Sequence, residues 1–270
     1  SVISKHLFPI YDKPMIYYSL SLLLLARIKD IIVISDGKNL NLYKNLLGNG
    51  KKLGINISYL LQEKPEGIAQ GILISKDKIK NKKICLVLGD NILYGNNLIQ
   101  VLDQAKQRKK GATIFAYYVD DPSSCGVVKF DKHLKAKKLV EKPKKFISNY
   151  AIPGIYFYDE NVVEIAESIK KSRRGEYEIT SINEVYLKKN MLNVSVLNRG
   201  FAWLDTGTID NLNAASNFFM AIEKRQGLKI SCLEEIALNN KWITRTKLLQ
   251  LINKMDAQSD YAKYLKKIIN

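Results

Sequence analysis

The feature that most constrains the fold is an apolar run that ends abruptly on an acid. Leu86-Val87-Leu88 has the composition of a buried strand, and Gly89-Asp90-Asn91 follows it directly. Open α/β sheets bind their ligands beyond the carboxyl ends of their strands. A carboxylate at that edge is a hard oxygen ligand suited to Mg²⁺ that carries phosphates. Taken alone, however, the segment is better explained as an ordinary turn, because Gly, Asp and Asn all form turns.

Apolar β-type runs alternate with helical periodicity over the first part of the chain. The run DIIVIS at 30–35, for example, is β-branched in its interior and is typical of a buried parallel strand. This alternation is the β-α-β rhythm of a doubly wound sheet. We expect strands over 30–35, 55–61, 84–88 and 112–119, and helices over 14–28, 40–47, 68–78 and 98–108.

The middle of the chain changes character and the tail is helical. We expect a hairpin of strands, three further strands and three helices before the tail, with the helix at 180–189 capped by Thr180 or Ser181. The expected ranges are strands 126–130, 136–141, 150–158, 194–197 and 201–204, and helices 161–171, 180–189 and 212–226. The fold class is therefore α/β, a Rossmann-like doubly wound mixed sheet over 1–229 with a helical C-terminal appendage over 230–270.

The net charge of +17 suggests a nucleic-acid partner, but the pattern of charges argues against one. Only seven of the 43 basic residues are arginine, and the lysines are scattered in short runs. The charge comes without a helix-turn-helix, zinc-finger or aromatic RNA-binding pattern. We expect a solvated basic surface, which still favours anionic substrates.

The apolar runs and cysteines indicate a cytoplasmic protein. The densest apolar stretch, Leu20–Ala26, is too short to span a bilayer, and charged residues interrupt any leader-like apolar region. The three cysteines (Cys85, Cys125 and Cys232) are far apart and lack metal-site spacing. We therefore expect free thiols and no membrane partner.

Three further segments combine acids with phosphate-binding cations. Glu141-Lys142-Pro143 ends an expected strand, Asp205 follows the apolar Trp203-Leu204, and Arg174 precedes Gly175 and Glu176. Asp90 and Asp205 could converge on one metal, and a guanidinium suits bidentate phosphate contact. Individually, these segments are equally explained as a salt-bridged hairpin end, an Asp-Thr-Gly turn and a charged loop.

Many short motifs follow one another in order along the whole chain. They are SKHL and PIYDKPMIYY at 4–18, Gln62 with EGIAQ at 66–70, LVLGDN at 86–91, GVV at 126–128, EKP at 141–143, NYA at 149–151, GIYFYD at 154–159, RGE at 174–176, AWLDTGT at 202–208, QGLK at 226–229, and SC with EEIA at 231–237. Together they resemble the glucose-1-phosphate thymidylyltransferases, a family with the sugar nucleotidyltransferase type of fold.

The resemblance implies roles for the charged residues. Asp90 and Asp205 would hold Mg²⁺. Lys5 would lie against the nucleotide phosphates, while Lys142 and Arg174 would hold the sugar 1-phosphate. Catalysis would then come from in-line positioning and from neutralisation of phosphate charge, without a covalent intermediate.

The resemblance also implies a base pocket and a sugar pocket. Gln62 would hydrogen-bond the thymine edge, since a glutamine amide offers both a donor and an acceptor, and the backbone at Gly67 would complete the base pocket. Glucose hydroxyls would contact Glu141 and the backbone at Gly126 and Ile152, with Asn91, Glu176 and Trp203 shaping the pocket.

The implied reaction joins dTTP and glucose 1-phosphate. The sugar-phosphate oxygen would attack the α-phosphorus of dTTP and expel pyrophosphate, giving dTDP-glucose. This product commonly enters dTDP-rhamnose and surface polysaccharide synthesis, and family members are homotetramers. A nucleotidyltransferase for another base or sugar remains an alternative, as does a degenerate paralogue that binds nucleotide or assembles without catalysis.

The chain departs from the family pattern in one major place. Family members open with a strand and a Gly-Gly-x-Gly-Thr-Arg loop that cradles the triphosphate, whereas this sequence starts at Ser1, shortly before Lys5. We therefore expect a sheet without its central strand, no backbone cradle for phosphate, and impaired turnover. Smaller departures are Cys125, where tyrosine is usual, and Pro153, which removes a backbone donor beside the sugar site.

Overall fold

The computed structural model describes residues 4–269. Its strands are β1 (Pro9–Ile10), β2 (Lys13–Pro14), β3 (Asp30–Ser35), β4 (Asn56–Leu61), β5 (Ile84–Val87), β6 (Asn91–Gly95), β7 (Ala112–Tyr118), β8 (Gly126–Phe130), β9 (Ala136–Glu141), β10 (Tyr150–Ala151), β11 (Ile155–Tyr158), β12 (Leu192–Leu197) and β13 (Phe201–Asp205). Its helices are η1 (Lys5–Leu7), α1 (Met15–Leu25), α2 (Gly37–Leu47), η2 (Lys51–Leu53), α3 (Gln70–Ile79), α4 (Leu98–Gln107), α5 (Val162–Ser168), α6 (Ile179–Lys188), α7 (Ile209–Gln226), α8 (Leu233–Asn239), α9 (Arg245–Ile252) and α10 (Asp260–Ile269).

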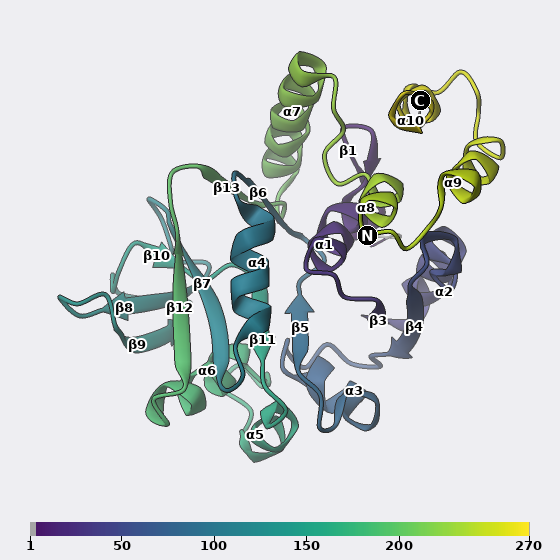
Figure 1. The fold of residues 1–270 in the computed structure, drawn as a ribbon. Coiled ribbons are helices and arrows are strands. Elements are labelled where there is room, and N and C mark those ends of the chain that lie inside the picture. The colour runs from purple at the N-terminus through teal and green to yellow at the C-terminus, as the bar shows by residue number, and fades with distance from the viewer. Residues whose placement is uncertain (1–3, 270) are drawn as a thin grey trace.

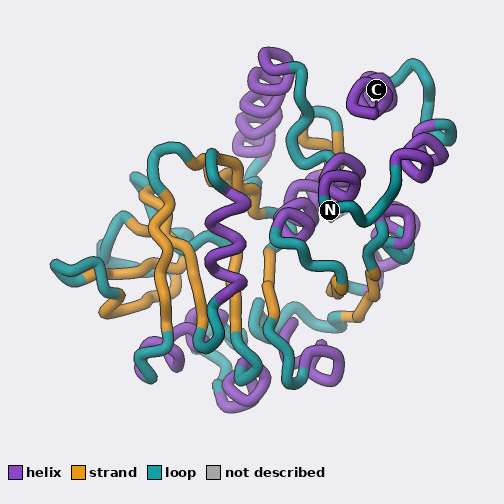
Figure 2. The backbone as a smooth tube through the Cα atoms, viewed as in Figure 1, coloured by secondary structure: helices purple, strands orange, loops and turns teal. Residues whose placement is uncertain are grey.

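The main sheet is mixed and is covered by helices on both faces (Figures 1 and 2). Its strands follow the order β5-β11-β7-β10-β8-β9, with β12 parallel to β7. Successive side chains of β7 point to opposite faces: Ile114 packs with α3, α5 and α6, whereas Phe115 packs with α1 and α4. The central strand is therefore buried on both sides, which is the layered α/β arrangement predicted from the sequence.

The sheet is interrupted between β3 and β5. Among residues 4–269, β3 pairs only with β4 and β5 pairs only with β11, so the edges that face each other form no ladder. A cavity of about 1240 Å³ lies between these strands; it is walled by apolar side chains such as Ile32, Ile72 and Leu86, and basic residues including Arg27 and Lys83 also line it.

Two expectations about the strands are corrected. The strand expected over 150–158 is two short strands, β10 and β11, because the chain bends at Pro153-Gly154, where a Cβ on Gly154 would come within 2.5 Å of Leu88. The segment after Asp90, expected to be a turn, continues as β6 and pairs antiparallel with β13.

The expected cap of the helix at 180–189 is also wrong. Helix α6 begins at Ile179, and Glu178 precedes it without a side-chain cap. The hydroxyl of Thr180 instead donates to Glu141 of β9, so a tertiary contact uses the group that capping would have required.

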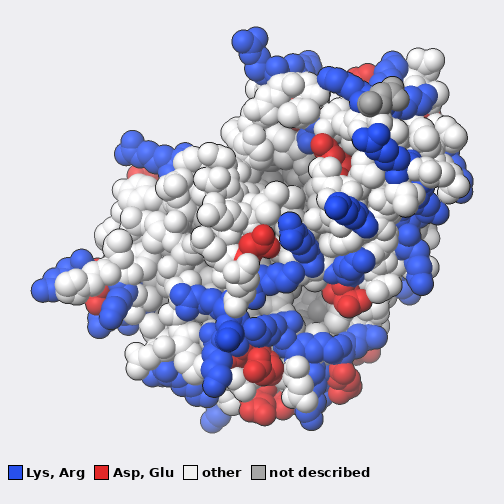
Figure 3. All heavy atoms as spheres, in the orientation of Figure 1, with Lys and Arg blue, Asp and Glu red and all other residues white. Residues whose placement is uncertain are grey.

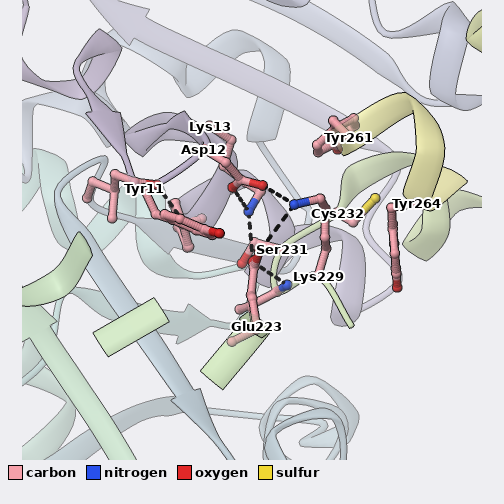
Figure 4. A network of polar contacts seen from close by, with 12 residues as sticks. Tyr11, Asp12, Lys13, Glu223, Lys229, Ser231, Cys232, Tyr261 and Tyr264 are labelled. Carbon is pink, nitrogen blue, oxygen red and sulfur yellow. Dashed lines mark hydrogen bonds and ion pairs between the residues drawn. The ribbon is translucent and has the colours of Figure 1, made fainter. Parts of the chain in front are cut away.

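A set of charges, of which Lys13 and Glu223 are buried, joins the N-terminal elements to the end of α7. We call Asp12, Lys13, Glu223 and Lys229 the structural cluster (Figure 4). Lys13 Nζ lies 2.5 Å from Asp12 and 3.0 Å from Glu223, with its side chain 1% exposed. Lys229 contacts the same two acids. The cluster fixes the β1–β2 turn against the end of α7 and the segment that leads to the C-terminal helices.

Helices α8, α9 and α10 share a hydrophobic cluster of their own, which includes Ala237, Leu248 and Leu265. In Figure 1 they lie at the upper right, beside α2 and the N-terminal elements. Across residues 4–269 the search for a helix long and apolar enough to cross a bilayer finds none. Figure 3 shows lysine and arginine spread widely over one face, with a largely uncharged area over α4 and β12.

Candidate functional site

The structure brings the two predicted metal-binding acids onto neighbouring strand ends. Asp90 follows β5 and Asp205 ends β13, whose register places Asp205 opposite Asn91. Thr206 fixes the junction, because its hydroxyl donates to the carbonyl of Asp90 at 2.9 Å. The β6–β13 ladder, which the sequence did not reveal, is thus what makes the acids converge.

Hydroxyl groups from other elements hold the turn that carries Asp90. Ser19 of α1 donates to the carbonyl oxygen of Gly89 at 2.8 Å and lies 3.4 Å from that of Asn91. The hydroxyl of Thr206 donates to the carbonyl of Asp90, which lies between these two residues in sequence. Sequence reasoning missed Ser19 and Thr206; the available signal was a serine buried in an otherwise leucine-rich helix, which needs an acceptor nearby.

The two acids differ in their electrostatic surroundings. Asp90 Oδ2 pairs with Lys5 Nζ at 2.6 Å and Oδ1 accepts from Asn91 Nδ2 at 3.0 Å. Burial pushes the pKa of Asp90 upward, but these hydrogen bonds and the Lys5 charge outweigh it and hold the pKa below its ordinary value. Asp205 is open to solvent on one side, yet partial desolvation and the charge of Asp90 raise its pKa.

Lys142 completes a set that we call the acid-pair cluster: Lys5, Asp90, Lys142 and Asp205. Lys142 has a left-handed φ of 42°, and its N–H donates to the carbonyl of Cys125 at 3.0 Å. The positive charges of Lys5 and Lys142 both oppose the rise in the pKa of Asp205, so all four groups interact. The thiol of Cys125 lies beside them, and burial raises its pKa.

The acid pair fits a magnesium ion that brings its own phosphate ligands. Among residues 4–269 no group of three or more His, Cys, Asp or Glu side chains forms a complete metal site. Mg²⁺, however, is commonly bound by one or two carboxylates together with water and substrate phosphates. Desolvation and, after it, repulsion from Asp90 raise the pKa of Asp205, and a divalent cation between the two acids would relieve that repulsion.

Two of the three residues predicted to shape the sugar pocket, Asn91 and Trp203, lie at the same turn. The third, Glu176, lines the cavity between β3 and β5 instead. Asn91 is buried, and its Oδ1 accepts hydrogen bonds from Trp203 Nε1 and from the N–H of Gly154, both at 2.8 Å. Asn91 and Trp203 therefore orient Asp90 in this structure. Glu141 accepts from Thr180.

The backbone groups predicted to meet glucose are partly committed within the fold. The N–H of Ile152 donates to the carbonyl of Gly126 at 2.8 Å. A sugar hydroxyl could therefore bond only to the backbone groups of Gly126 and Ile152 that do not take part in this hydrogen bond. Their roles as substrate contacts remain predictions.

The predicted base residues lie on a different wall. Gln62 Nε2 donates to Gln70 Oε1 at 2.6 Å, and Gly67 has a φ of 102° with Tyr177 so near that a Cβ would come within 2.4 Å of its carbonyl oxygen. Only glycine fits there. Gln62, Gly67 and Glu176 line the cavity between β3 and β5, which also reaches Gly89.

Arg174 is not part of the acid-pair cluster. Its guanidinium lies 3.0 Å from Glu176 and 3.6 Å from Glu178, on the segment before α6. That segment bonds to the Gly67 turn, because the N–H of Tyr177 donates to the carbonyl of Glu66 at 2.7 Å. The structure therefore places Arg174 on the loop that adjoins the predicted base pocket. There its guanidinium pairs with acids, and it does not join Lys142 in the acid-pair cluster.

Comparisons with known proteins agree on one family. The nucleotidyl transferase family pattern matches residues 1–221. The chain is 47% identical over 267 residues to a glucose-1-phosphate thymidylyltransferase of Neisseria meningitidis, covering 99% of this chain and 92% of the relative. It is 48% identical over 268 residues to that of Mycolicibacterium smegmatis, again covering 99% and 92%.

A solved structure extends the likeness to the fold. A Bacillus anthracis protein solved as a glucose-1-phosphate thymidylyltransferase in complex with a sucrose superposes with a TM-score of 0.74 at 34% identity, covering 80% of this chain and 87% of that one. The predicted sugar nucleotidyltransferase fold is confirmed. The chain belongs to the nucleotidyl transferase family and, within it, to the glucose-1-phosphate thymidylyltransferases.

Proposed function

We propose that this protein transfers a thymidylyl group from dTTP to glucose 1-phosphate, releasing dTDP-glucose and pyrophosphate. The observation that carries the proposal is the convergence of Asp90 and Asp205 between Lys5 and Lys142, in a chain of this family. Two acids flanked by two lysines match a reaction in which phosphate charge must be held and neutralised.

Each charged group has a separate task in the proposed mechanism. Lys5 binds nucleotide phosphates, and Lys142 holds the phosphate of the sugar so that its oxygen faces the α-phosphorus in line. Asp90 and Asp205 hold Mg²⁺, which when bound supplies positive charge to the phosphate oxygens. Arg174 meets the sugar phosphate only if it leaves Glu176 and Glu178, so substrate must compete with these acids for it.

The uncharged groups select the substrates. Gln62 and Gly67 read the base, and Glu141 with the backbone near Gly126 and Ile152 binds glucose hydroxyls. Trp203, Asn91 and Glu176 complete the walls of the pocket. Hydrogen bonds to Gln70 and from Thr180 hold the side chains of Gln62 and Glu141 within the fold, which supports a preoriented pocket.

Three broader features belong to the same proposal. The protein works in the cytoplasm as a homotetramer, and its product supplies dTDP-sugar synthesis, such as that of dTDP-rhamnose for polysaccharide. Residues 1–229 form the catalytic domain and 230–270 an appendage, a division supported by the separate hydrophobic cluster of the last three helices.

The test is pyrophosphate release with a panel of nucleotides and sugars. Incubation with dTTP, glucose 1-phosphate and Mg²⁺ should give turnover that chelation with EDTA abolishes. UTP in place of dTTP, and other hexose 1-phosphates in place of glucose 1-phosphate, should react more slowly. Faster turnover with UTP would reassign the base, and calorimetric binding of dTTP without any turnover would instead support a non-catalytic paralogue.

A further inference from the structure

One face of helix α2 holds the turn that carries Lys5. Asn39 and Tyr43 are four residues apart, so their side chains share a face. Asn39 Oδ1 accepts from the N–H of Ser4 at 2.8 Å. Tyr43 Oη lies 2.8 Å from Ser4 Oγ and 3.0 Å from His6 Nδ1. The helix thus contacts the residue before Lys5 and the residue after it.

These contacts are built into the fold. Tyr43 is 3% exposed and Asn39 is 9% exposed. The amide of Asn39 has one orientation, because its Nδ2 donates to both oxygens of Asp36 at 3.0 and 2.9 Å. Asp36 in turn caps the start of α2. Asn39 Oδ1 therefore points to the turn, and buried polar groups of this kind fix a single arrangement.

The other side of the turn meets the acid-pair cluster. Lys5 Nζ lies 2.6 Å from Asp90 Oδ2. The His6 ring lies flat against Gly89, where a Cβ would come within 3.1 Å of it. The turn therefore joins α2, which follows β3, to the end of β5 across the interruption in the sheet.

We propose that Asn39 and Tyr43 are positioning residues that hold Lys5 where it meets the nucleotide phosphates, an inference that rests on the proposed function. A lysine stem has high rotamer entropy. Holding the backbone on both sides of Lys5 reduces the freedom that a phosphate contact would otherwise have to remove. The helix acts through Lys5 and touches no reacting atom itself.

A double-mutant cycle tests this coupling. Tyr43→Phe removes one hydroxyl and should lower kcat/KM for thymidylyl transfer about tenfold, mainly through kcat. In a Lys5→Met background the same change should have no further effect, because the group it positions is gone. An equal loss in both backgrounds would overturn the proposal.

Tyr59→Phe is the matched control. Tyr59 donates its hydroxyl to the carbonyl of Gly48 at the far end of α2 and lies 3.4 Å from the carbonyl of Tyr43. This variant therefore removes bonds to the backbone of the same helix, whereas the side chains of Asn39 and Tyr43 that meet the turn stay in place. It should keep the activity of the unsubstituted chain. If Tyr59→Phe lost as much activity as Tyr43→Phe, the effect would come from the helix in general and the proposal would be wrong.

Amine labelling separates this inference from the proposed function. Reductive methylation followed by peptide mass spectrometry measures the reactivity of Lys5, with the exposed Lys76 as internal reference. Tyr43→Phe should increase labelling of Lys5 several-fold relative to Lys76, and Tyr59→Phe should not. This holds even if the chain transfers no thymidylyl group; unchanged labelling in Tyr43→Phe would refute the positioning role.

Discussion

The structural cluster and the acid-pair cluster contain the same charges but use them differently. Each has two lysines and two acids, so the formal charges cancel in both. In the structural cluster both lysines contact both acids, and Lys13 is 1% exposed. In the acid-pair cluster Lys5 is 40% exposed, and among the described residues Asp205 has no cation within ion-pair distance. The ion pairing of the structural cluster is complete, whereas the acid-pair cluster can still bind a charged ligand.

The difference shows that completeness of pairing, rather than composition, distinguishes a structural ion network from a binding site. A charged group whose ionic partners all come from the chain contributes to folding. It has no free position at which a substrate could bind. A charge left short of partners marks a candidate site, as Asp205 does. Lys5 and Lys13 are eight positions apart in sequence, yet Lys5 belongs to the acid-pair cluster and Lys13 to the structural cluster.

The largest effect is expected from opening the structural cluster. Lys13→Met leaves the buried Glu223 and the neighbouring Asp12 with only Lys229 for compensation, and should lower the free energy of unfolding by about 3–5 kcal/mol. Urea denaturation measures it. The control is Lys76→Met, which breaks an exposed pair with Glu167 and should change stability by about 0–1 kcal/mol. Similar losses in the two variants would mean that the structural cluster contributes no more to stability than an exposed ion pair does, which would contradict its assigned role.

A smaller free-energy change, measured through activity, is expected in the acid-pair cluster. Asp205→Asn should reduce thymidylyl transfer by a factor on the order of 10²–10³, because an electrostatic contact made in the transition state is lost. Pyrophosphate release measures it. Asp210→Asn removes an equal charge from the exposed first turn of α7 and should leave turnover unchanged. Full activity in Asp205→Asn would refute its assigned role.

The smallest effect concerns stability against pH. Because the pKa of Asp205 is raised in the folded protein, its contribution to stability is present below its unfolded value of about 3.9 and is lost as pH rises through the folded value. Asp205→Asn should therefore raise the melting temperature near neutral pH and show a smaller gain near about pH 4. A gain that did not shrink on acidification would contradict the raised pKa.

Local patterns predicted several elements directly. The β-branched run of β3 and the hairpin β8–β9 have the bounds that the sequence indicates. Strand β6 was missed because the Asp90-Asn91 turn signal precedes it and its partner β13 is distant in sequence. Pro153 broke the expected long strand, as proline does when a ladder donor is removed.

The site was predictable as a set of residue types but not as an arrangement. The strand-end positions of Asp90 and Asp205 were evident from apolar runs, whereas their convergence depends on the β6–β13 ladder. The placement of Arg174 depends on loop contacts with Glu66 and on its own acidic neighbours. No local pattern distinguishes buried Lys13 from exposed Lys5, because the acid Glu223 that buries Lys13 is 210 positions away.

That separation has a consequence for how the chain is made. Lys13 is synthesised 210 positions before Glu223, an interval of roughly 10–40 s at about 5–20 residues per second. Until the end of α7 exists, the β1–β2 turn can pair its lysine only with Asp12, the acid next to it, and lacks the buried partner Glu223. Closure of the cluster is therefore a late event in folding, so that the β1–β2 turn acquires its final ion pairs only after the end of α7 has been synthesised.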